Sequence, residues 1–446
     1  SGDSLAEKVT RGYILQRFVT ACAGRGAYPI KFNGSIFTVD NPDYIRDGKK
    51  VKMDADFREW GGQYWFQNTR AMYWPRLAAG DFDMMMPLFK MYAGMLPANE
   101  KQVEGYYHHD GAYFAETAPF WGGLSYVGPD AKENYTAHYF TPVLELSMMM
   151  LDYYEYTGDK KFARDILLPV ASNGIKFFNK HFPRDNNGKL LLDPDNAIEM
   201  YWKVHDPAPD IAGLHAVLQR LTALPNELVG DSLLKQWKNF QTELPGLPIG
   251  TKNNLEVLLP YTGPQTAPSH NMENPELYAI YPFRLYGLGK PRLQLAINTF
   301  KERKINSRGC WIQDPIQAAM LGQTEVAKEK TVFDLTNKDP GLKFPAFWDK
   351  AHDYMPDEDN GGNGENGLQQ MLMYVDGKKI ILLPAWPKAW NVSFKLHAPY
   401  NTTVQGTVKE GKITNLIVTP VSRKVNVIMA KVFILNRSIT TPITAP

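Results

Sequence analysis

The stretch YTAHYFTPVLELSMMMLDYYEYTG, residues 135–158, decides the fold class of this chain. Leu144 and Met148 lie four residues apart within an apolar series at helical spacing, which predicts one long helix with an apolar face. Gly158 then ends the pattern, and a second helical pattern begins at Lys161. A helix, a short glycine link and another helix together predict an antiparallel helix hairpin.

The same arrangement recurs along roughly the first 335 residues. Further helices are expected at 12–23, 68–77, 82–96, 102–113, 161–178, 210–224, 232–242, 275–286, 291–303, 315–321 and 325–335. The links between them are often short and contain Gly or Pro, as helix hairpins require. About twelve helices in six hairpins predict a mainly α fold, a closed (α/α)6 toroid. An open solenoid of helix pairs is the alternative, although we find no repeat motif of fixed period.

Near residue 370 the pattern changes to short β-rich segments. Strands are expected at 380–383, 392–396, 402–408, 413–418, 424–430 and 431–435. The sequence Lys409-Glu410-Gly411-Lys412 is a hairpin turn between two of them. We place the domain boundary in the polar, glycine-rich stretch 357–367. This predicts a catalytic toroid at 1–365 and a small antiparallel, sandwich-like β-domain at 366–446.

Composition excludes several classes of protein. The 446 residues are 22% charged and 44% hydrophobic, with a net charge of +2, which is typical of a globular protein and not of a disordered or collagenous chain. There is no long basic run and no apolar run of about 20 residues, so we expect neither nucleic acid binding nor membrane insertion. Two cysteines cannot build a disulfide framework. The start, Ser1-Gly2-Asp3, is not a signal peptide.

Aromatic residues make up 12% of the chain, and their placement is informative. Seven of the ten Trp lie in or beside irregular segments that also carry carboxylates and amides, namely Trp60, Trp65, Trp74, Trp121, Trp202, Trp311 and Trp348. Such a mixture suits a ligand with apolar faces and many hydroxyls, which is a carbohydrate. The alternative is a set of buried structural networks.

These segments are 56–70, 107–123, 195–210, 270–276, 308–314 and 347–363. In a toroid the loops between helices meet at one mouth, where ligands bind. We therefore expect one cavity to be lined by Trp65, Asn68, Glu116, Glu199, Glu273, Trp311 and Asp314.

Other chemistries have little support in the sequence. It has no HExxH or CxxC motif for zinc, no G-x-S-x-G elbow and no GxGxxG loop, so we expect no metal and no cofactor. Asp357 and Asp359 are a candidate calcium pair, but the EF-hand spacing is missing, which favours a solvated acidic loop. The adjacent His108 and His109 are assigned a structural or hydrogen-bonding role.

A pair of carboxylic acids is the remaining option, because glycoside hydrolysis requires one protonated and one ionised carboxyl group. Glu199 is the best candidate for the acid. It follows Ala197-Ile198 and precedes Met200-Tyr201-Trp202, and burial among such residues raises a carboxyl pKa. The alternative is a glutamate that caps a helix or forms an ion pair.

At these residues the chain resembles glycoside hydrolase family 95, the inverting α-L-fucosidase group. The similarity lies in 15–26, in 68–75 with its Tyr73-Trp74-Pro75 ending, in 274–282, in 308–322 and in 370–390. The chain is most similar to a divergent branch typical of gut Bacteroidetes. Full-length members carry an N-terminal β-domain, so one interpretation is that this chain is a fragment.

The resemblance implies that Glu199 is the general acid. It also implies that Asn68 is the second of two asparagines that orient the base and its water, with Phe66 in place of the first. The family's base falls near Asn306 and Ser307, neither of which is a carboxylate. The base must therefore be relocated or absent.

Our substitute for the base is Asp314, three residues after Trp311; its rivals are Glu116, Glu273 and Asp357. The residues expected to bind substrate are Trp65, Asn68, Arg70, Glu116, Trp121, Glu273 and Trp311. Fucose specificity is not carried over, because too many contact residues differ.

The leading hypothesis is an inverting glycoside hydrolase that acts on an oligosaccharide or polysaccharide of plant or host origin. We expect a monomer or weak oligomer that is periplasmic or secreted. One alternative is a carbohydrate-binding protein that kept the pocket and lost the base. Another is a polysaccharide lyase, whose base would be His108, His109 or Tyr113.

Overall fold

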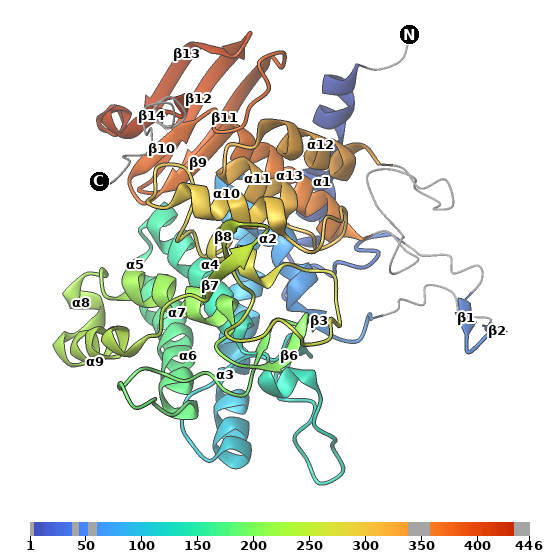
Figure 1. The fold of residues 1–446 in the computed structure, drawn as a ribbon. Coiled ribbons are helices and arrows are strands. Elements are labelled where there is room, and N and C mark those ends of the chain that lie inside the picture. Colours follow the sequence, from blue (N-terminus) through green and yellow to red (C-terminus); the bar gives the residue numbers. More distant parts are fainter. Residues whose placement is uncertain (1–3, 38–43, 52–59, 338–356, 432–446) are drawn as a thin grey trace.

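The computed structural model describes residues 4–37, 44–51, 60–337 and 357–431. Its helices form an (α/α)6 toroid, and the strands of the C-terminal part form a small β unit at one end of it (Figure 1). This confirms the predicted fold class. The sequence segments 56–59 and 347–356 lie outside the described residues.

Six elements in the described part of the chain form the inner ring. They are α2 (Phe66–Ala79), α4 (Thr141–Thr157), α7 (Ala208–Leu221), η4 (Pro275–Ala279), α11 (Asp314–Met320) and α13 (Glu358–Leu372). Consecutive members pack together from α2 to η4, and α13 packs against both α11 and α2. A backbone hydrogen bond of 3.0 Å from Leu288 N to Met320 O joins the turn after η4 to α11. The ring is therefore closed.

The outer helices cover this ring. They are α1 (Leu5–Ala23), α3 (Met86–Tyr107), α6 (Leu168–His181), α9 (Asp231–Glu243), α10 (Leu293–Glu302) and α12 (Thr324–Thr336). Short turns complete the layer: η1 (Phe82–Met85), η2 (Tyr135–His138), α5 (Lys160–Phe162), η3 (Ala163–Leu167) and α8 (Asn226–Val229). The outer helices have exposed faces, whereas α2 and α13 are buried almost all round, as expected for helices inside a double ring.

Two helix predictions need correction. The expected helix at 275–286 is only the short η4, because Pro282 lacks the amide that would continue it. Conversely, the two helices expected at 82–96 and 102–113 are joined in α3, which passes through Pro97 without a break.

The glycine-rich stretch 357–367 is not a solvated linker. It forms α13, a buried inner helix, so the predicted boundary at 365/366 falls inside a helix that continues to Leu372. Glycine is needed because α13 crosses α2 closely: a Cβ on Gly362 would lie 2.6 Å from the carbonyl oxygen of Ala71. A Cβ on Gly367 would lie 2.7 Å from the Thr331 hydroxyl and 2.9 Å from the Pro315 side chain. The polar, glycine-rich composition therefore reflects close helix packing.

The C-terminal unit contains two three-stranded sheets. One has the order β14 (Val427–Met429), β10 (Lys379–Leu382), β9 (Met373–Asp376), and the other has the order β11 (Val392–Ala398), β12 (Thr402–Lys409), β13 (Lys412–Thr419). The second sheet is antiparallel, as predicted, and β14 pairs in parallel with β10. Residues 421–426 form the 3-10 turn η5, and all but the first residue of the strand expected at 431–435 lies outside the described residues.

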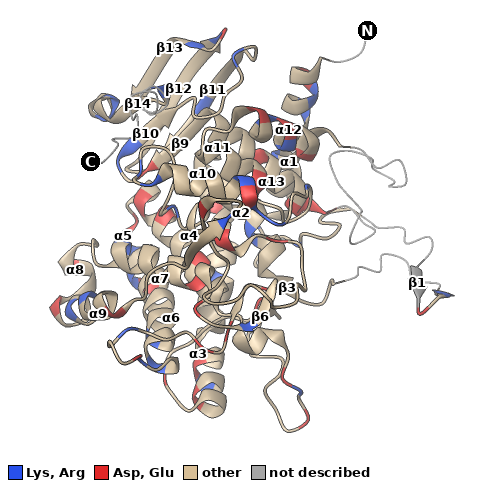
Figure 2. Ribbon diagram, in the orientation of Figure 1, with Lys and Arg blue, Asp and Glu red and all other residues tan. Residues whose placement is uncertain are grey.

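In the described part of the chain, three small hairpins and one pair of strands distant in sequence, β3 (Tyr64–Trp65) with β4 (Thr117–Ala118), lie on the toroid. The hairpins are β1 (Tyr44–Arg46) with β2 (Lys49–Val51), β5 (Asp195–Ala197) with β6 (Tyr201–Val204), and β7 (Ile249–Lys252) with β8 (Leu255–Leu258). Lys and Arg alternate with Asp and Glu over the ribbon (Figure 2). Among the described residues, no helix combines the length and the hydropathy that crossing a membrane would require.

We expect Gly362→Ala to destabilise the protein, since the new methyl group would collide with the backbone of α2. Overpacking of this kind costs about 1–3 kcal/mol. Chemical denaturation measures the change. Gly94→Ala is the matched control, because Gly94 lies in α3 with open space around its missing Cβ. There alanine should stabilise the helix by up to about 1 kcal/mol. Equal stability of the two variants would contradict the close-packing argument.

Candidate active site

The candidate site lies at the end of the toroid where the inner helices begin. Gln67 and Arg70 are in the first turns of α2, Asp210 is in the first turn of α7, and Asp359 is in the first turn of α13. Helix N-termini carry partial positive charge, which favours anionic groups nearby. Acidic side chains cluster at this end of the ring.

Arg70 is the centre of this group. Its guanidinium pairs with Glu145 from α4 and, at 2.8 Å, with Glu273 from the segment before η4. Glu273 also accepts hydrogen bonds from the Tyr278 hydroxyl, at 3.0 Å, and from the Gln67 amide. All five side chains are buried. One cation thus connects three inner elements of the ring.

Glu116 caps helix α2 from outside. Its carboxylate accepts from the backbone N–H of Gln67 at 3.2 Å and from the Tyr135 hydroxyl at 2.9 Å. The helix's own cap position, Trp65, supplies no side-chain bond, so Glu116 replaces it. Burial, and then the nearby charge of Glu199, raise the pKa of Glu116 to about 8.

Glu199 lies at the tip of the β5–β6 hairpin. It follows Ile198, whose backbone has φ +52°, a left-handed conformation that is costly for a β-branched residue. Its carboxylate accepts a hydrogen bond from the Asn271 amide. Burial, followed by the charge of Glu273, raises the pKa of Glu199 to about 7. The backbone strain and the raised pKa both occur beside the predicted acid.

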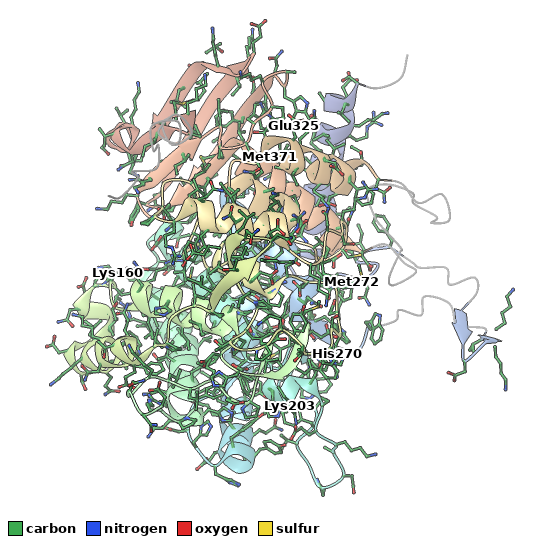
Figure 3. All side chains as sticks on the ribbon, viewed as in Figure 1. Lys160, Lys203, His270, Met272, Glu325 and Met371 are labelled. Carbon is green, nitrogen blue, oxygen red and sulfur yellow. The ribbon has the colours of Figure 1, made fainter. Side chains whose placement is uncertain are left out.

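An aromatic wall supports this hairpin. The Trp202 ring stacks between Tyr135, at 5.5 Å, and His270, at 3.7 Å, with both rings nearly parallel to it. The Trp202 indole N–H donates to the carbonyl oxygen of Glu199 at 2.8 Å. His270 and Met272 lie close to β6 on the same side of the molecule (Figure 3). The wall therefore fixes the main chain at Glu199.

A second polar group lies one residue further along α2. The Asn68 amide donates to the Asp359 carboxylate at 2.6 Å, and the other Asp359 oxygen accepts from the Asn360 N–H at 2.7 Å. The turn at Cys310 is attached to α13, since its amide donates to the Asn360 side chain at 3.2 Å. Asn68 and Asp359 thus form a buried amide–carboxylate pair between α2 and α13.

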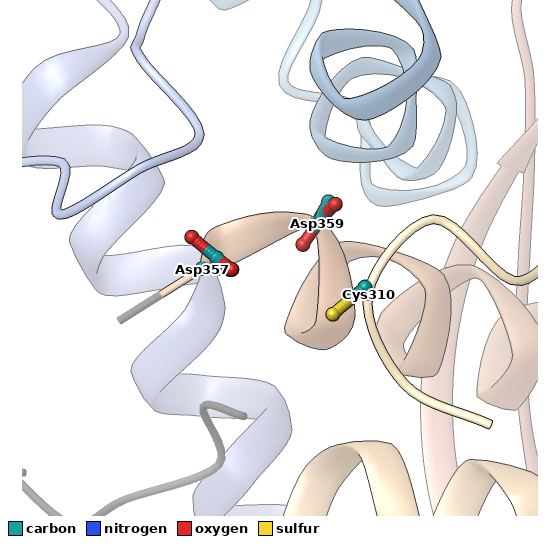
Figure 4. Close-up of side chains that lie close together, drawn as sticks. All are labelled: Cys310, Asp357 and Asp359. Carbon is teal, nitrogen blue, oxygen red and sulfur yellow. The ribbon is translucent and has the colours of Figure 1, made fainter. Parts of the chain in front are cut away.

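Cys310, Asp357 and Asp359 lie together at the start of α13 (Figure 4). One ligand atom of each lies within 4.8 Å of the others, and all three residues are buried. This donor set contains a sulfur, which the hard Ca²⁺ ion disfavours, and both Asp359 oxygens already accept hydrogen bonds. The residues therefore do not fit the calcium pair considered from the sequence.

Comparisons with known proteins also indicate a glycoside-active enzyme. The profile of the glycosyl hydrolase family 95 catalytic domain matches residues 53–364. The chain belongs to this family. No curated protein sequence matches it significantly.

One solved structure with the same fold is described as "Putative kojibiose phosphorylase from human microbiome". It superposes with a TM-score of 0.59 at 10% sequence identity, over 93% of this chain and 66% of that chain. This chain therefore spans a little under two thirds of that protein. At such low identity the likeness concerns the fold alone.

In this family 95 domain, many predicted site residues do lie together. Arg70, Glu116, Glu199 and Glu273 are linked by ion pairs, hydrogen bonds or close charge interactions. Asn68 is the neighbour of Gln67, which contacts both Glu116 and Glu273. These residues come from four separate segments of the chain.

The predicted tryptophans are more dispersed. Trp65 is half-buried at the start of α2, where its indole donates to the carbonyl oxygen of Trp60 at 3.2 Å. Trp311 belongs to the turn at Cys310, next to α13. Trp121 is 65% exposed, beyond β4, with its ring 4.7 Å from Phe120.

Asp314 is not brought to the group of acidic side chains. It is buried in the first turn of α11, where its carboxylate pairs with Arg303 at 2.8 Å and faces Lys330 at 3.7 Å. Burial raises the pKa of Asp314, and the charges of Arg303 and then Lys330 oppose that rise. Because the partners of Asp314 are these two cations and not the acidic group around Arg70, it is no longer our preferred base.

Of the residues suggested for a lyase base, His109 and Tyr113 lie in another cluster, and His108 is the exposed residue that ends α3. The His109 ring is 3.1 Å from the His181 ring nitrogen, and the Tyr113 hydroxyl contacts those of Tyr107 and Tyr126. Their rings pack with Phe140 and Phe177. This aromatic cluster stabilises α6 against α3 and α4, which favours the structural role assigned to the histidines.

Several residues of the site were missed in the sequence. Gln67, Tyr135, Asn271 and Trp202 contact the carboxylates or their main chain. Gln67 could have been found, because it precedes Asn68 and lies one helical turn from Arg70. Tyr135 gave no such signal, since its contact with Glu116 depends on how distant segments pack.

We expect Arg70→Met to destabilise the protein by about 3–5 kcal/mol at pH 7, because Glu145 and Glu273 would remain buried without their cation. The loss should be smaller at pH 5, because burial raises the pKa of Glu145 to about 7 and its carboxyl group takes up a proton at the lower pH. Urea unfolding at the two pH values measures this. The triple variant R70M/E145Q/E273Q should recover stability at pH 7. A loss independent of pH would contradict the electrostatic explanation.

Proposed function

We propose that this family 95 domain hydrolyses a glycosidic bond with inversion and that Glu199 is the general acid. The observation that carries the proposal is the position of Glu199. Its carboxyl group is half-buried at the tip of a strained hairpin, and its pKa is raised to about 7. A carboxylic acid with such a pKa keeps its proton near neutral pH and can give it to the leaving oxygen.

The water-activating side is assigned to Asn68 and Asp359. In an inverting mechanism a second carboxylate removes a proton from water on the opposite face of the sugar. Asp359 is buried. The Asn68 side-chain nitrogen donates to the Asp359 carboxylate, so the amide oxygen of Asn68 faces away from Asp359. Asn68 also matches a family position that orients the base and its water. Asp359 therefore replaces Asp314 in the proposal.

The proposed substrate is an oligosaccharide or polysaccharide. Trp65 and Trp311 lie beside the two polar groups, and aromatic faces stack on the C–H faces of sugars. The structural neighbour is described as a phosphorylase, so phosphate is a conceivable nucleophile instead of water. However, the cation that contacts these carboxylates, Arg70, is already shared by Glu145 and Glu273. A phosphate dianion among these groups would be repelled, which favours water.

The first test is Glu199→Gln, which preserves shape and removes the proton. Turnover of natural glycans should fall at least about a hundredfold, the usual contribution of general acid catalysis. Aryl glycosides with good leaving groups should be affected much less, because their leaving oxygen needs little protonation. In the unmodified enzyme kcat/KM should fall as pH rises through about 7, since the acid then loses its proton. The variant should lack that decrease.

Equal losses on both substrate types would remove the acid role from Glu199. A protein that binds glycans but turns over neither substrate would support the carbohydrate-binding alternative. Unsaturated products absorbing in the ultraviolet would indicate a lyase, and a requirement for phosphate would indicate phosphorolysis.

The second test compares Asp359→Asn with Asp314→Asn. Loss of the base should slow natural and aryl substrates alike, by about a hundredfold or more, because both need an activated water. Azide should restore turnover of an activated aryl glycoside by Asp359→Asn, since azide attacks without a base. Asp314→Asn should lower stability more than it changes the ratio of turnover rates on natural and aryl substrates. NMR of the first-formed sugar should show the inverted anomer. If Asp314→Asn slowed both substrates and Asp359→Asn did not, the base would be Asp314.

A further inference from the structure

A pair of buried carboxyl groups lies behind the proposed acid, outside the reacting group. Asp195 is on β5 and Asp210 is in the first turn of α7, and both side chains are 0% exposed. Strand β5 packs against α7, and the two carboxyl groups lie within hydrogen-bonding reach of each other. A hydrogen bond between two carboxyl groups requires a proton on one of them, because an ionised carboxylate is only an acceptor.

The remaining contacts indicate where that proton is. One Asp195 oxygen accepts from the N–H of Asn196 at 2.8 Å, and its other oxygen has no N–H or O–H donor from another residue, whereas the Thr141 hydroxyl lies within hydrogen-bonding reach of Asp210. Asp210 is near the positive end of α7, which favours its ionised form. Asp195 therefore holds the proton on its second oxygen and donates it to Asp210.

The charged groups around the pair are either acidic or already paired with other residues. Glu145 of α4 adds negative charge near Asp210, and Asp206, in the link before α7, adds it near Asp195. From η2, His138 approaches the carbonyl of Pro194 and pairs with Glu133. These neighbours offer the pair no cation, so its stability depends on the shared proton.

Two further elements pack against the pair's helix and strand. On η4, Tyr278 donates to Glu273, and the charge interactions of Glu276 are with Lys252, Arg303 and Asp314. On β6, Lys203 pairs with Glu133 at 2.8 Å. Their charged groups are therefore directed to other partners.

The pair fixes the base of the hairpin that carries Glu199. Asp195 is four residues before Glu199, and the intervening Ile198 holds a left-handed backbone that would relax unless its surroundings constrained it. The hairpin's other fixed points are Asn196, which bonds the Tyr135 carbonyl and the Lys203 N–H, and the Trp202 bond to Glu199. Asp195 is the point that attaches it to the inner helix α7.

We propose that Asp195 and Asp210 share a proton and that this hydrogen bond positions the Glu199 hairpin for acid catalysis. The inference rests on the proposed function of Glu199. It makes Asp195 and Asp210 positioning residues, which act through the hairpin and not on the substrate. Burial, followed by the negative charge of Asp210, raises the pKa of Asp195 well above its usual range, which favours retention of the proton.

The test uses Asp195→Ala and Asp195→Asn. The alanine variant loses the bond and should misplace Glu199, reducing turnover of natural glycans about ten- to a hundredfold, as small displacements of a catalytic group do. Aryl glycosides with good leaving groups should be affected less, since they depend little on the acid. The asparagine variant keeps a donor toward Asp210 and should restore the natural rate. Asp193→Ala, at an exposed position two residues before β5, is the control and should change neither rate.

A pH measurement tests the shared proton independently of activity. Carboxyl groups whose pKa is raised on folding destabilise the protein increasingly as pH rises above their unfolded value, near 4. The midpoint of urea unfolding should therefore fall between pH 5 and pH 8 in the unmodified protein. Asp195→Asn cannot ionise at this position and should show a smaller fall. An unchanged fall would overturn the shared proton, even if the alanine variant does not fold.

The outcomes separate this inference from the proposed function. If Glu199→Gln spares aryl glycosides but Asp195→Ala slows both substrates equally, only the positioning role is overturned. If Glu199→Gln shows no dependence on the leaving group, the acid assignment fails first. Failure of Asp195→Asn to restore the rate would also overturn the inference.

Discussion

The packing around the site depends on one buried cation, the Arg70 guanidinium, which lies among several acidic side chains. Arg70 joins α2 to α4 through Glu145 and to the segment before η4 through Glu273. The described residues connected to it by hydrogen bonds or close charge interactions include six carboxyl groups, on Glu116, Glu145, Asp195, Glu199, Asp210 and Glu273. A single cation cannot neutralise them, so several must hold protons. The raised pKa of Glu199 is thus a property of the whole group.

Closure of the ring is the constraint that brings these acids together. Helix α13 returns to α2 after almost 300 residues of sequence, and glycines on it allow the two backbones to approach closely. The same crossing forms the Asn68–Asp359 hydrogen bond. Packing and the proposed water-activating pair therefore have a common origin. A bulkier α13 would separate Asp359 from Asn68.

The Glu199 hairpin shows how local strain and distant packing combine. The β5–β6 hairpin carries Glu199 beside a left-handed Ile198. Asn196 bonds the Tyr135 carbonyl oxygen of η2, Trp202 stacks on His270, and Asp195 lies within hydrogen-bonding reach of Asp210 on α7. Without these contacts the strained backbone would relax. The position of the proposed acid is consequently set by residues outside the proposed reacting group.

Apolar neighbours and the family resemblance made Glu199 the candidate acid. Sequence periodicity by itself determined the helical class, most helix positions and the hairpin turn Lys409–Lys412, because these follow from local spacing. It misassigned α13, since a glycine-rich polar stretch has the composition of a linker and only a facing helix shows why small residues are needed. It also selected Asp314 from its nearness to a family motif. Only the tertiary structure showed which groups surround the two candidate bases, Arg303 and Lys330 at Asp314 and Asn68 at Asp359, because a carboxylate's chemistry is set by the charges and donors that surround it in space.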